Sequence, residues 1–227
     1  MRDMPTLHPR VLALLLDAGF YGAYQIGHIQ LDWALVTALV ERWRVETHTF
    51  HMPFGECTIT LQDVEILTGL PVDGEPVTGL DMSRSAEEWQ QLCIELLGDA
   101  PDVDDMDKGR LKVRWLSDRF HRLPVGADHR VVQYYARAHI MMHIGGWLFA
   151  DKSQSKVKLM FLPLLRDLGC LGGFSWGSAV LATLYRHMCV ATRTETKEIG
   201  GPLILLQVLL NIFIFYIELR NYKSNYD

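Results

Sequence analysis

The sequence predicts a mainly α protein, a single multi-helix globular domain with a small β-hairpin near residues 47–61. Apolar residues recur at helical spacing in most of the chain, whereas strict alternation is confined to the hairpin region. The regular exchange of strand and helix patterns that a parallel sheet requires is missing from the sequence. A length of 227 residues and a hydrophobic fraction of 49% suit one large domain with a sizeable core.

The N-terminal part begins with two predicted helices. Pro9 favours the first turn of a helix that runs through Leu16, and Gly19 follows as a stop. In a second helix, over residues 31–43, apolar side chains recur at every fourth position: Leu31, Leu35, Leu39 and Trp43. This stripe is typical of an amphipathic helix, and it predicts that Trp43 fills the core.

The hairpin is predicted where THTFHM and CTITL alternate on either side of the turn sequence PFGE. Thr60 then caps a further helix, because Asp63 stands three residues later, as in a capping box. Gly69, followed by Pro71, ends that helix.

The rest of the chain is also predicted to be helical. Ser85 with Glu88 opens a capped helix, and residues 98–109 form an acidic surface loop. Pro163 either kinks a helix or marks its start. The expected helices span residues 85–98, 110–120, 128–149 and 155–168 and a buried stretch after Ser175.

Charge and cysteine content narrow the class of protein. A net charge of −5 does not favour general attraction to nucleic acid or to an anionic membrane. The four cysteines are widely spread, which predicts reduced thiols in an intracellular protein. The apolar segment 202–219 approaches the length of about 20 residues that spans a bilayer, but Gln207 and Asn211 lie inside it. We therefore favour a buried terminal helix over a membrane segment.

Two histidines, a glutamate and a cysteine gather in the hairpin region, and they raise the possibilities of a zinc site or a nucleophile. On an extended strand His48 and His51 point to opposite faces, and a fourth ligand at typical spacing is missing. Cys57 alternates in phase with expected core positions, and nothing in the sequence indicates an activated thiol. We therefore expect no metal, no cofactor and no catalytic residue, with His48, Glu56 and Cys57 in structural roles.

The segment KGRLKVRWLSDRFHR interleaves cations with Trp115 and Phe120, a pattern found in nucleic-acid-binding surfaces. The candidate phosphate contacts are Arg110, Lys112 and Arg114. The alternative, which we favour, is the solvated basic face of an amphipathic helix, partly neutralised by the Asp-rich loop before it.

Long stretches of the chain resemble the plant mobile domain family. They are LHPRVLALLLDAGFYGAYQIGHIQLDWALVTALVERWR, ETHTFHMPFGECTITLQDVEILTGLPVDGEPVTG, LFADKSQSKVKLMFLPLLRDL, GGFSWGSAVLATLYRHMC and GGPLILLQ. Together they cover nearly everything up to Gln207. We therefore expect a plant mobile domain over residues 1–207 and a divergent apolar segment over residues 208–227.

The resemblance implies a nuclear protein linked to transposable-element silencing, genome stability and meristem maintenance. It also implies a protein partner, such as a type-7 serine/threonine phosphatase-like protein. The family's aminotransferase-like label does not imply a pyridoxal-phosphate enzyme, which would need a Schiff-base lysine, a phosphate cup and usually a large α/β domain. The candidate binding residues, at positions of the family motif, are Trp43, His48, Phe50, Glu56, Asp63 and Trp176.

The resemblance to the family assigns no catalytic residue to any position of this sequence. The expected function is therefore that of a non-enzymatic interaction domain. Nucleic-acid binding, in keeping with an origin in transposons, is the alternative. Hydrolase or transferase activity is the third hypothesis, and it requires a pocket that gathers titratable groups.

Overall fold

The computed structural model describes residues 7–26, 30–53, 55–79, 84–150, 153–193, 195–196, 198–208 and 210–211, and it confirms a mainly α fold. The α-helices are α1 (Pro9–Asp17), α2 (Tyr21–Ile26), α3 (Trp33–Arg42), α4 (Leu61–Thr68), α5 (Ala86–Leu97), α6 (Val113–Arg119), α7 (His129–His143) and α8 (Trp176–Ala191). Shorter helical segments are the 3₁₀ turns η1 (Val103–Asp105), η3 (Leu159–Leu165) and η4 (Leu168–Gly173) and the π-helical turn η2 (Ile144–Leu148).

Two small antiparallel sheets accompany the helices. The first sheet contains β1 (Trp43–Arg44), β2 (Thr49–Met52) and β3 (Gly55–Cys57), and the second contains β4 (Met106–Asp107), β5 (Arg110–Lys112) and β6 (Lys156–Lys158). Each sheet keeps its strands in sequence order, so β6 is an edge strand.

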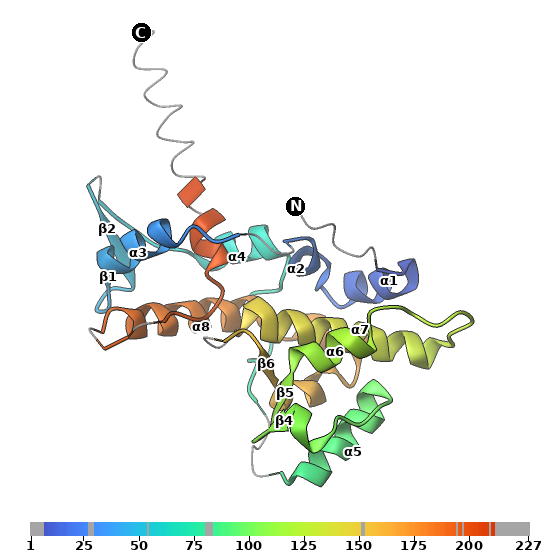
Figure 1. The fold of residues 1–227 in the computed structure, drawn as a ribbon. Coiled ribbons are helices and arrows are strands. Elements are labelled where there is room, and N and C mark those ends of the chain that lie inside the picture. The colour runs from blue at the N-terminus through green and yellow to red at the C-terminus, as the bar shows by residue number, and fades with distance from the viewer. Residues whose placement is uncertain are drawn as a thin grey trace.

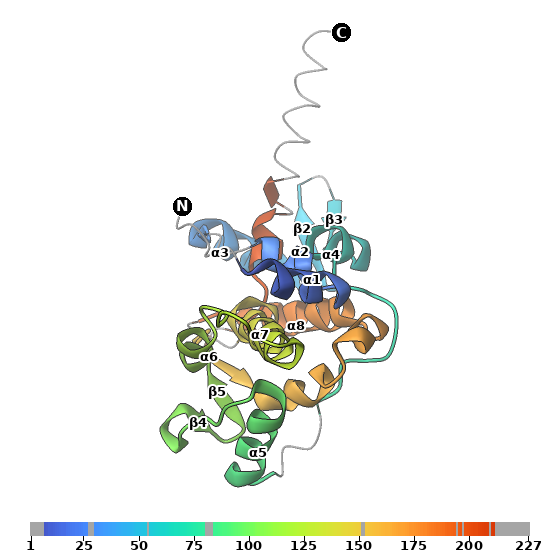
Figure 2. The same ribbon diagram turned by 90° about the vertical axis from the view of Figure 1, so that its right-hand side faces the viewer.

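Helices α7 and α8 form a central layer between these two sheets (Figure 1). Helices α1 to α4 and the first sheet lie on one side of this layer, and α5 and the second sheet lie on the other, as Figure 2 also shows. Helix α1 packs on α7, and α4 packs on α8. The apolar core runs through the central layer and continues into both sides.

The N-terminal ends of α4 and α5 confirm the caps that the sequence predicts there, whereas the Ser175 side chain makes no capping hydrogen bond at the start of α8. The Thr60 and Ser85 side chains accept hydrogen bonds from the backbone N–H groups of Asp63 and Glu88, whose carboxylates bond back to the cap residues. Gly69 ends α4 in the left-handed conformation, which a residue with a side chain rarely adopts. These local signals are strong because each satisfies backbone groups that the helix itself leaves unpaired.

The first sheet confirms the predicted hairpin and extends it by one strand. His51 of β2 lies opposite Glu56 of β3, and β1 pairs with the other edge of β2. Trp43 lies opposite Phe50, and their ring centroids are 4.8 Å apart. Both rings are buried, so this sheet is anchored in the core by its aromatic residues.

The second sheet is absent from the sequence prediction, and two predicted helices are therefore wrong in part. Residues 110–112 form β5 before α6 begins, and residues 156–158 form β6 before a 3₁₀ segment. In β5 and β6, Leu111 and Val157 lie opposite each other and are buried, which holds the two strands on the core. Pro163 lacks a backbone N–H, which disfavours a regular α-helix after β6.

The described part of the C-terminal apolar segment is folded onto the domain. Leucine side chains at positions 203, 205 and 206 are buried. Gln207 accepts a hydrogen bond from the backbone N–H of Asp32 at 2.9 Å and donates one to the carbonyl of Gln30. Within the described ranges, none of the helices combines the length and the apolar character that crossing a membrane requires. Residues 212–227 lie outside the described residues, so the prediction for 208–227 remains a prediction.

Candidate functional site

The aromatic residues of the family motif are core residues. Trp43, Phe50 and Trp176 are 3%, 1% and 0% exposed, respectively. The Trp43 indole N–H points toward the sulfur of Cys189 at 3.4 Å, and the Trp176 indole N–H donates to the carbonyl of Leu171. No partner can reach these rings in the folded protein, so their contribution to binding is limited to holding other groups in place.

The polar motif residues are held by contacts inside the domain. The His48 ring stacks on Tyr185 with centroids 5.3 Å apart, and Glu56 accepts a hydrogen bond from the Thr49 hydroxyl at 3.1 Å. Asp63 is used by the capping box of α4. These groups serve the first sheet and its junction with α8, and they do not converge on a shared surface site.

The cysteine and histidines of the hairpin do not form an activated site either. Burial raises the pKa of the Cys57 thiol, which favours the protonated and less nucleophilic form. His48 lies in the turn before β2 rather than on a strand, with a φ of 53°. In the described part of the chain, no three His, Cys, Asp or Glu side chains are placed to hold a metal ion.

Three cations of the basic segment pair with acidic residues, two of them in the loop before it, although Arg110 and Lys112 lie on strand β5 and not on the predicted helix. Lys112 pairs with Asp105 at 3.2 Å, and Arg119 pairs with Asp99 at 3.1 Å. Arg114 pairs with Asp118, one turn later on α6. Arg110, Lys112 and Arg114 therefore do not act together as one free basic face.

A different set of cations lines a cavity between β6 and α8. This cationic cleft has a volume of about 290 Å³, and its basic lining residues are Arg110, Lys156, Lys158, Arg186 and His187. All three residues of β6 line it, as expected for a cavity at the free edge of a sheet. Among the described residues that line the cationic cleft, none is acidic.

The pairing of β5 with β6 places like charges directly opposite each other. Arg110 faces Lys158, and Lys112 faces Lys156, in the antiparallel register. Like charges in such positions destabilise a sheet. Lys112 and Lys156 are offset by Asp105 and Asp107, at 3.2 and 2.8 Å. In the Arg110–Lys158 pair, Arg110 is partly compensated by Asp107, which lies opposite it in β4, whereas Lys158 makes no ion pair with another described residue.

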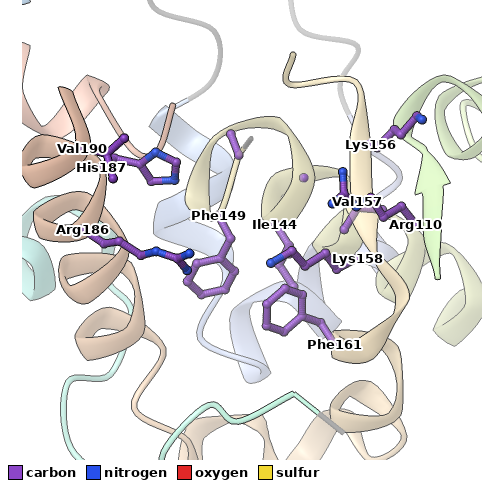
Figure 3. Close-up of a pocket in the computed structure, with 12 residues that line it drawn as sticks. Arg110, Ile144, Phe149, Lys156, Val157, Lys158, Phe161, Arg186, His187 and Val190 are labelled. Carbon is purple, nitrogen blue, oxygen red and sulfur yellow. The ribbon is translucent and has the colours of Figure 1, made fainter. Parts of the chain in front are cut away.

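Figure 3 shows how the charged side chains lie in the cationic cleft. Arg186 of α8 and Lys158 of β6 point toward the middle from opposite sides, with the rings of Phe149 and Phe161 between them. Lys156 points away, consistent with its ion pair with Asp107. The two cations that enter the cationic cleft make no ion pair with any residue that the structure describes.

The pKa of Asp107, on strand β4 at the other edge of the second sheet, responds to the positive charges of that sheet. Its carboxyl pKa is lowered by the hydrogen bond from Lys156 and by the charges of Lys156, Lys108 and Arg110. A carboxylate beside the cationic cleft is thus held in its charged form. The same field would favour the charged form of an anionic ligand.

The floor of the cationic cleft is aromatic and continuous with the core. Phe149 and Phe161 are stacked with ring centroids 5.0 Å apart, and Phe149 lies 6.3 Å from the ring of Trp176. Trp176 thus supports the floor from below, which gives this family-motif residue an indirect connection to the site.

A second cavity, of about 330 Å³, adjoins the cationic cleft and shares Phe149, Lys158, Phe161, Arg186 and His187 with it. The part of it that is not shared is lined mostly by apolar residues, among them Val77, Met160 and Ala182, and we call this part the apolar pocket. The two cavities meet at Lys158, Arg186 and His187, and the apolar pocket extends from these residues.

Gly145 of η2 allows β6 to approach and form one wall of the cationic cleft. A Cβ atom at Gly145 would lie 2.6 Å from the Cβ of Val157 and 3.0 Å from the Cγ2 of Val113. These contacts are too short for any larger residue without movement of the strand. The glycine therefore sets the position of the wall that carries Lys156 and Lys158.

Sequence reasoning identified Arg110 but missed the other residues of the cationic cleft. Lys156 and Lys158 alternate with Val157, a strand pattern that is only three residues long. Arg186 and His187 lie about thirty residues later on α8, and no sequence signal indicates that they face β6.

Comparisons with known proteins identify a family model and several relatives from Arabidopsis thaliana that are similar to the chain. The sequence model of the family described as plant mobile domain matches residues 19–214. An Arabidopsis thaliana protein named Serine/threonine-protein phosphatase 7 long form homolog is 48% identical over 208 residues, which are 92% of this chain and 15% of that protein. No solved structure matches the chain.

Two further Arabidopsis thaliana relatives carry related names. Protein MAINTENANCE OF MERISTEMS is 40% identical over 196 residues, which cover 86% of this chain and 40% of that protein. Protein MAIN-LIKE 2 is 39% identical over 201 residues, which cover 88% of this chain and 30% of that protein. The chain therefore spans well under half the length of each of these relatives.

Proposed function

The chain belongs to the plant mobile domain family, and from this premise we propose that it is a non-enzymatic interaction domain that acts in the nucleus. It binds an anionic segment of a protein partner in the cationic cleft. The observation that carries the proposal is the convergence of Lys158 and Arg186 over an aromatic floor. Through this partner the domain contributes to transposable-element silencing, genome stability and meristem maintenance.

Charge complementarity supports an anionic partner. The whole chain has a net charge of −5, so the cationic cleft is a local exception to its overall charge. Its cations are held close together although the β5–β6 register makes them repel each other. An anion bound between them would remove that repulsion and gain charge-assisted hydrogen bonds.

The placement of titratable groups supports a binding role over a chemical one. The candidate nucleophile, Cys57, belongs to the first sheet and is not among the residues that line the cationic cleft. His187 is the histidine of the described lining, and no carboxylate or thiol of that lining accompanies it as a general acid, a base or a nucleophile.

The name of one relative suggests a first candidate partner. That relative is named a phosphatase 7 long form homolog, and it contains a region similar to this chain. We therefore propose a type-7 serine/threonine phosphatase-like protein as the first partner to test.

The test is a binding titration between the purified chain and that candidate partner. The variant K158Q/R186Q removes both inward-pointing charges, and R42Q/R44Q removes two exposed charges that do not line the cationic cleft. We expect binding by the wild type and by R42Q/R44Q, and a loss of about tenfold or more in K158Q/R186Q. Absence of binding by the wild type, or equal binding by K158Q/R186Q, would contradict the proposal.

Nucleic-acid binding is the second candidate function, because Arg110, Lys112, Lys156 and Lys158 share one face of β5 and β6. Its test is retention of the wild-type chain on single-stranded DNA or RNA at low salt, with a steep loss as salt rises. The substitutions R110E, K112E and R114E should abolish that retention. No retention of the wild type at low salt would exclude this function.

A further inference from the structure

We infer that the cationic cleft recognises a phosphorylated serine or threonine in an extended segment of the partner protein. This inference rests on the proposed function, because it specifies the anion that the proposed partner presents. It follows from the number of uncompensated cations, from their placement around one small cavity, and from the apolar pocket beside them.

The number of uncompensated charges favours a phosphate monoester over a carboxylate. Lys158 and Arg186 line the cationic cleft without an ion pair to another described residue, and Arg110, which Asp107 partly compensates from the opposite position in β4, adds a third cation. A carboxylate brings one negative charge and two oxygens. A phosphorylated side chain brings a charge of about −1.5 to −2 and three acceptor oxygens, which matches three cations more closely.

The placement of the cations also fits a compact, tetrahedral anion. Arg186 approaches from α8 and Lys158 from β6, so an anion between them is contacted from two sides (Figure 3). Arginine donates through a planar fork, whereas lysine acts as a compact charge with three donors. Together they can contact different oxygens of one phosphate group within a cavity of about 290 Å³.

The surroundings of the cationic cleft disfavour a long polyanion. Nucleic acid requires cations that follow the path of its backbone. Here Lys112, Lys156 and Arg119 are already paired with Asp105, Asp107 and Asp99, respectively. The acidic loop that supplies these partners would repel phosphates that extended beyond the cationic cleft.

The apolar pocket and the edge strand favour a peptide over a free phosphorylated small molecule. The apolar pocket offers Val77 and Met160 to an apolar side chain next to the phosphorylated residue. Strand β6 has a free edge at the cationic cleft, so its main chain can pair with an extended segment. A phosphate compound without a peptide chain uses neither feature.

The experiment is affinity selection on the full 227-residue chain with degenerate peptide libraries. One library carries a fixed central phosphoserine or phosphothreonine, a second carries unmodified serine or threonine, and a third carries glutamate. We expect enrichment of the phosphorylated library of about tenfold or more over both others, with apolar residues selected beside the fixed position. The selected peptide should lose about tenfold or more in affinity for K158Q/R186Q, whereas R42Q/R44Q should bind like the wild type.

A fourth variant keeps the test informative if charge removal disturbs folding. K158R/R186K retains both positive charges but exchanges the positions of the planar guanidinium group and the compact ammonium group. We expect this variant to bind the selected peptide more weakly than the wild type and to keep the thermal unfolding curve of the wild type. Equal affinity of K158R/R186K and K158Q/R186Q for this peptide, both far below the wild type, would also support a site that depends on geometry. Wild-type affinity in K158Q/R186Q would overturn the inference.

The remaining outcomes separate this inference from the proposed function. If the glutamate library is retained as well as the phosphorylated one, and both are lost in K158Q/R186Q, the partner site stands and the phosphate inference fails. If no library is retained and the candidate partner does not bind, both fail. If free O-phosphoserine binds as tightly as the selected peptide, the peptide chain contributes nothing to binding, and the inference that the ligand is a phosphorylated peptide fails. Single-stranded DNA that displaces the peptide and binds more tightly overturns the assignment to a protein partner.

Discussion

The two three-stranded sheets have the same topology but use their polar residues in opposite ways. In the first sheet, the reactive side chains bond to neighbours: Glu56 to Thr49, and His48 to the ring of Tyr185. In the second sheet, Arg110 and Lys158 face each other, and Lys158 makes no ion pair with a described carboxylate, although Asp107 lies opposite Arg110. The residue types that attract attention in a sequence thus belong to the scaffold, whereas the uncompensated charges belong to the site.

This difference shows how stability and binding are divided in the domain. Satisfied polar groups and buried rings lower the free energy of the folded state. Cations held together against their mutual repulsion raise it, and a ligand that neutralises them recovers that energy. Substitutions in the first sheet should therefore reduce stability, and substitutions of the cleft cations should reduce binding alone.

The largest expected effect is that of W43A in the first sheet. It removes an indole that contacts Phe50 and Tyr185, with ring centroids 4.8 and 5.3 Å away, and leaves a cavity in the core. The free energy of unfolding in urea should fall by about 3–5 kcal/mol. A loss below about 1 kcal/mol would mean that the first sheet is not anchored as the structure indicates.

The comparison between the sheets has to be made at a pH at which the central layer is intact. Burial lowers the pKa of His139 in α7 from the ordinary value of 6.5 to about 4, although its hydrogen bond with the Phe120 carbonyl acts in the opposite direction. The unfolded chain therefore binds this proton more readily. Stability from neutral His139 is complete above pH 6.5 and is lost as the pH falls toward 4, by roughly 3 kcal/mol in total.

The variant H139Q tests this pH dependence, because glutamine can donate to the same carbonyl but does not titrate. Unfolding free energies of the wild type and of H139Q, measured from pH 7.5 to pH 4, should diverge in slope below pH 6.5. Parallel curves over that range would show that His139 is not the titrating group.

An intermediate effect is expected for G145A, which acts on the wall between the central layer and the second sheet. The added methyl would meet Val157 at 2.6 Å, so β6 has to move or strain. The free energy of unfolding should fall by about 1–3 kcal/mol, and the affinity for the selected peptide should fall as well. G146A is the matched control, since a Cβ there meets no atom within 4 Å. If G145A and G146A have equal free energies of unfolding and equal peptide affinities, the close approach of β6 to Gly145 is contradicted.

A smaller effect is expected for Y185F, which leaves the ring contacts of the first sheet in place. The hydroxyl donates to the Ile59 carbonyl at 2.6 Å and also lies 3.0 Å from the Thr58 hydroxyl. Its removal should lower the free energy of unfolding by about 1–2 kcal/mol, measured in urea, without any effect on peptide affinity. A change in affinity would place this side of α8 in the binding site.

The smallest effect on stability is expected for K158Q in the second sheet. Loss of the charge opposite Arg110 should leave the free energy of unfolding within about 0.5 kcal/mol of the wild type, or raise it slightly. Any gain should be larger at low salt, because the repulsion is less screened there. Destabilisation by more than about 1 kcal/mol would show that Lys158 supports the fold, and the contrast between the sheets would be lost.

The sequence predicts the elements whose signals are local. The capping boxes at Thr60 and Ser85, and the alternation of apolar and polar residues around Phe50, each depend on a few adjacent residues. The structure confirms these elements. The prediction fails at the second sheet, because β5 and β6 are three residues each and lie far apart in the sequence. Short strands gain their stability from the pairing itself, which a linear pattern does not reveal.

The candidate site is less predictable than the fold for the same reason. The cationic cleft combines Arg110, β6 and α8, and only the tertiary structure brings them together. Conversely, the sequence predicts only that the Asp-rich loop partly neutralises the basic segment, and the structure identifies the pairs, Lys112 with Asp105 and Arg114 with Asp118. The residues of a cluster indicate its chemistry, but their neighbours in space determine whether that chemistry is available.

The central claim is that Lys158 and Arg186 are present for a ligand and not for the fold. It is tested most directly by titrating the selected phosphopeptide into the wild type and into K158Q/R186Q, at a temperature at which thermal unfolding shows both proteins to be folded. We predict a loss of affinity of about tenfold or more in the double variant. Equal affinities would contradict the claim.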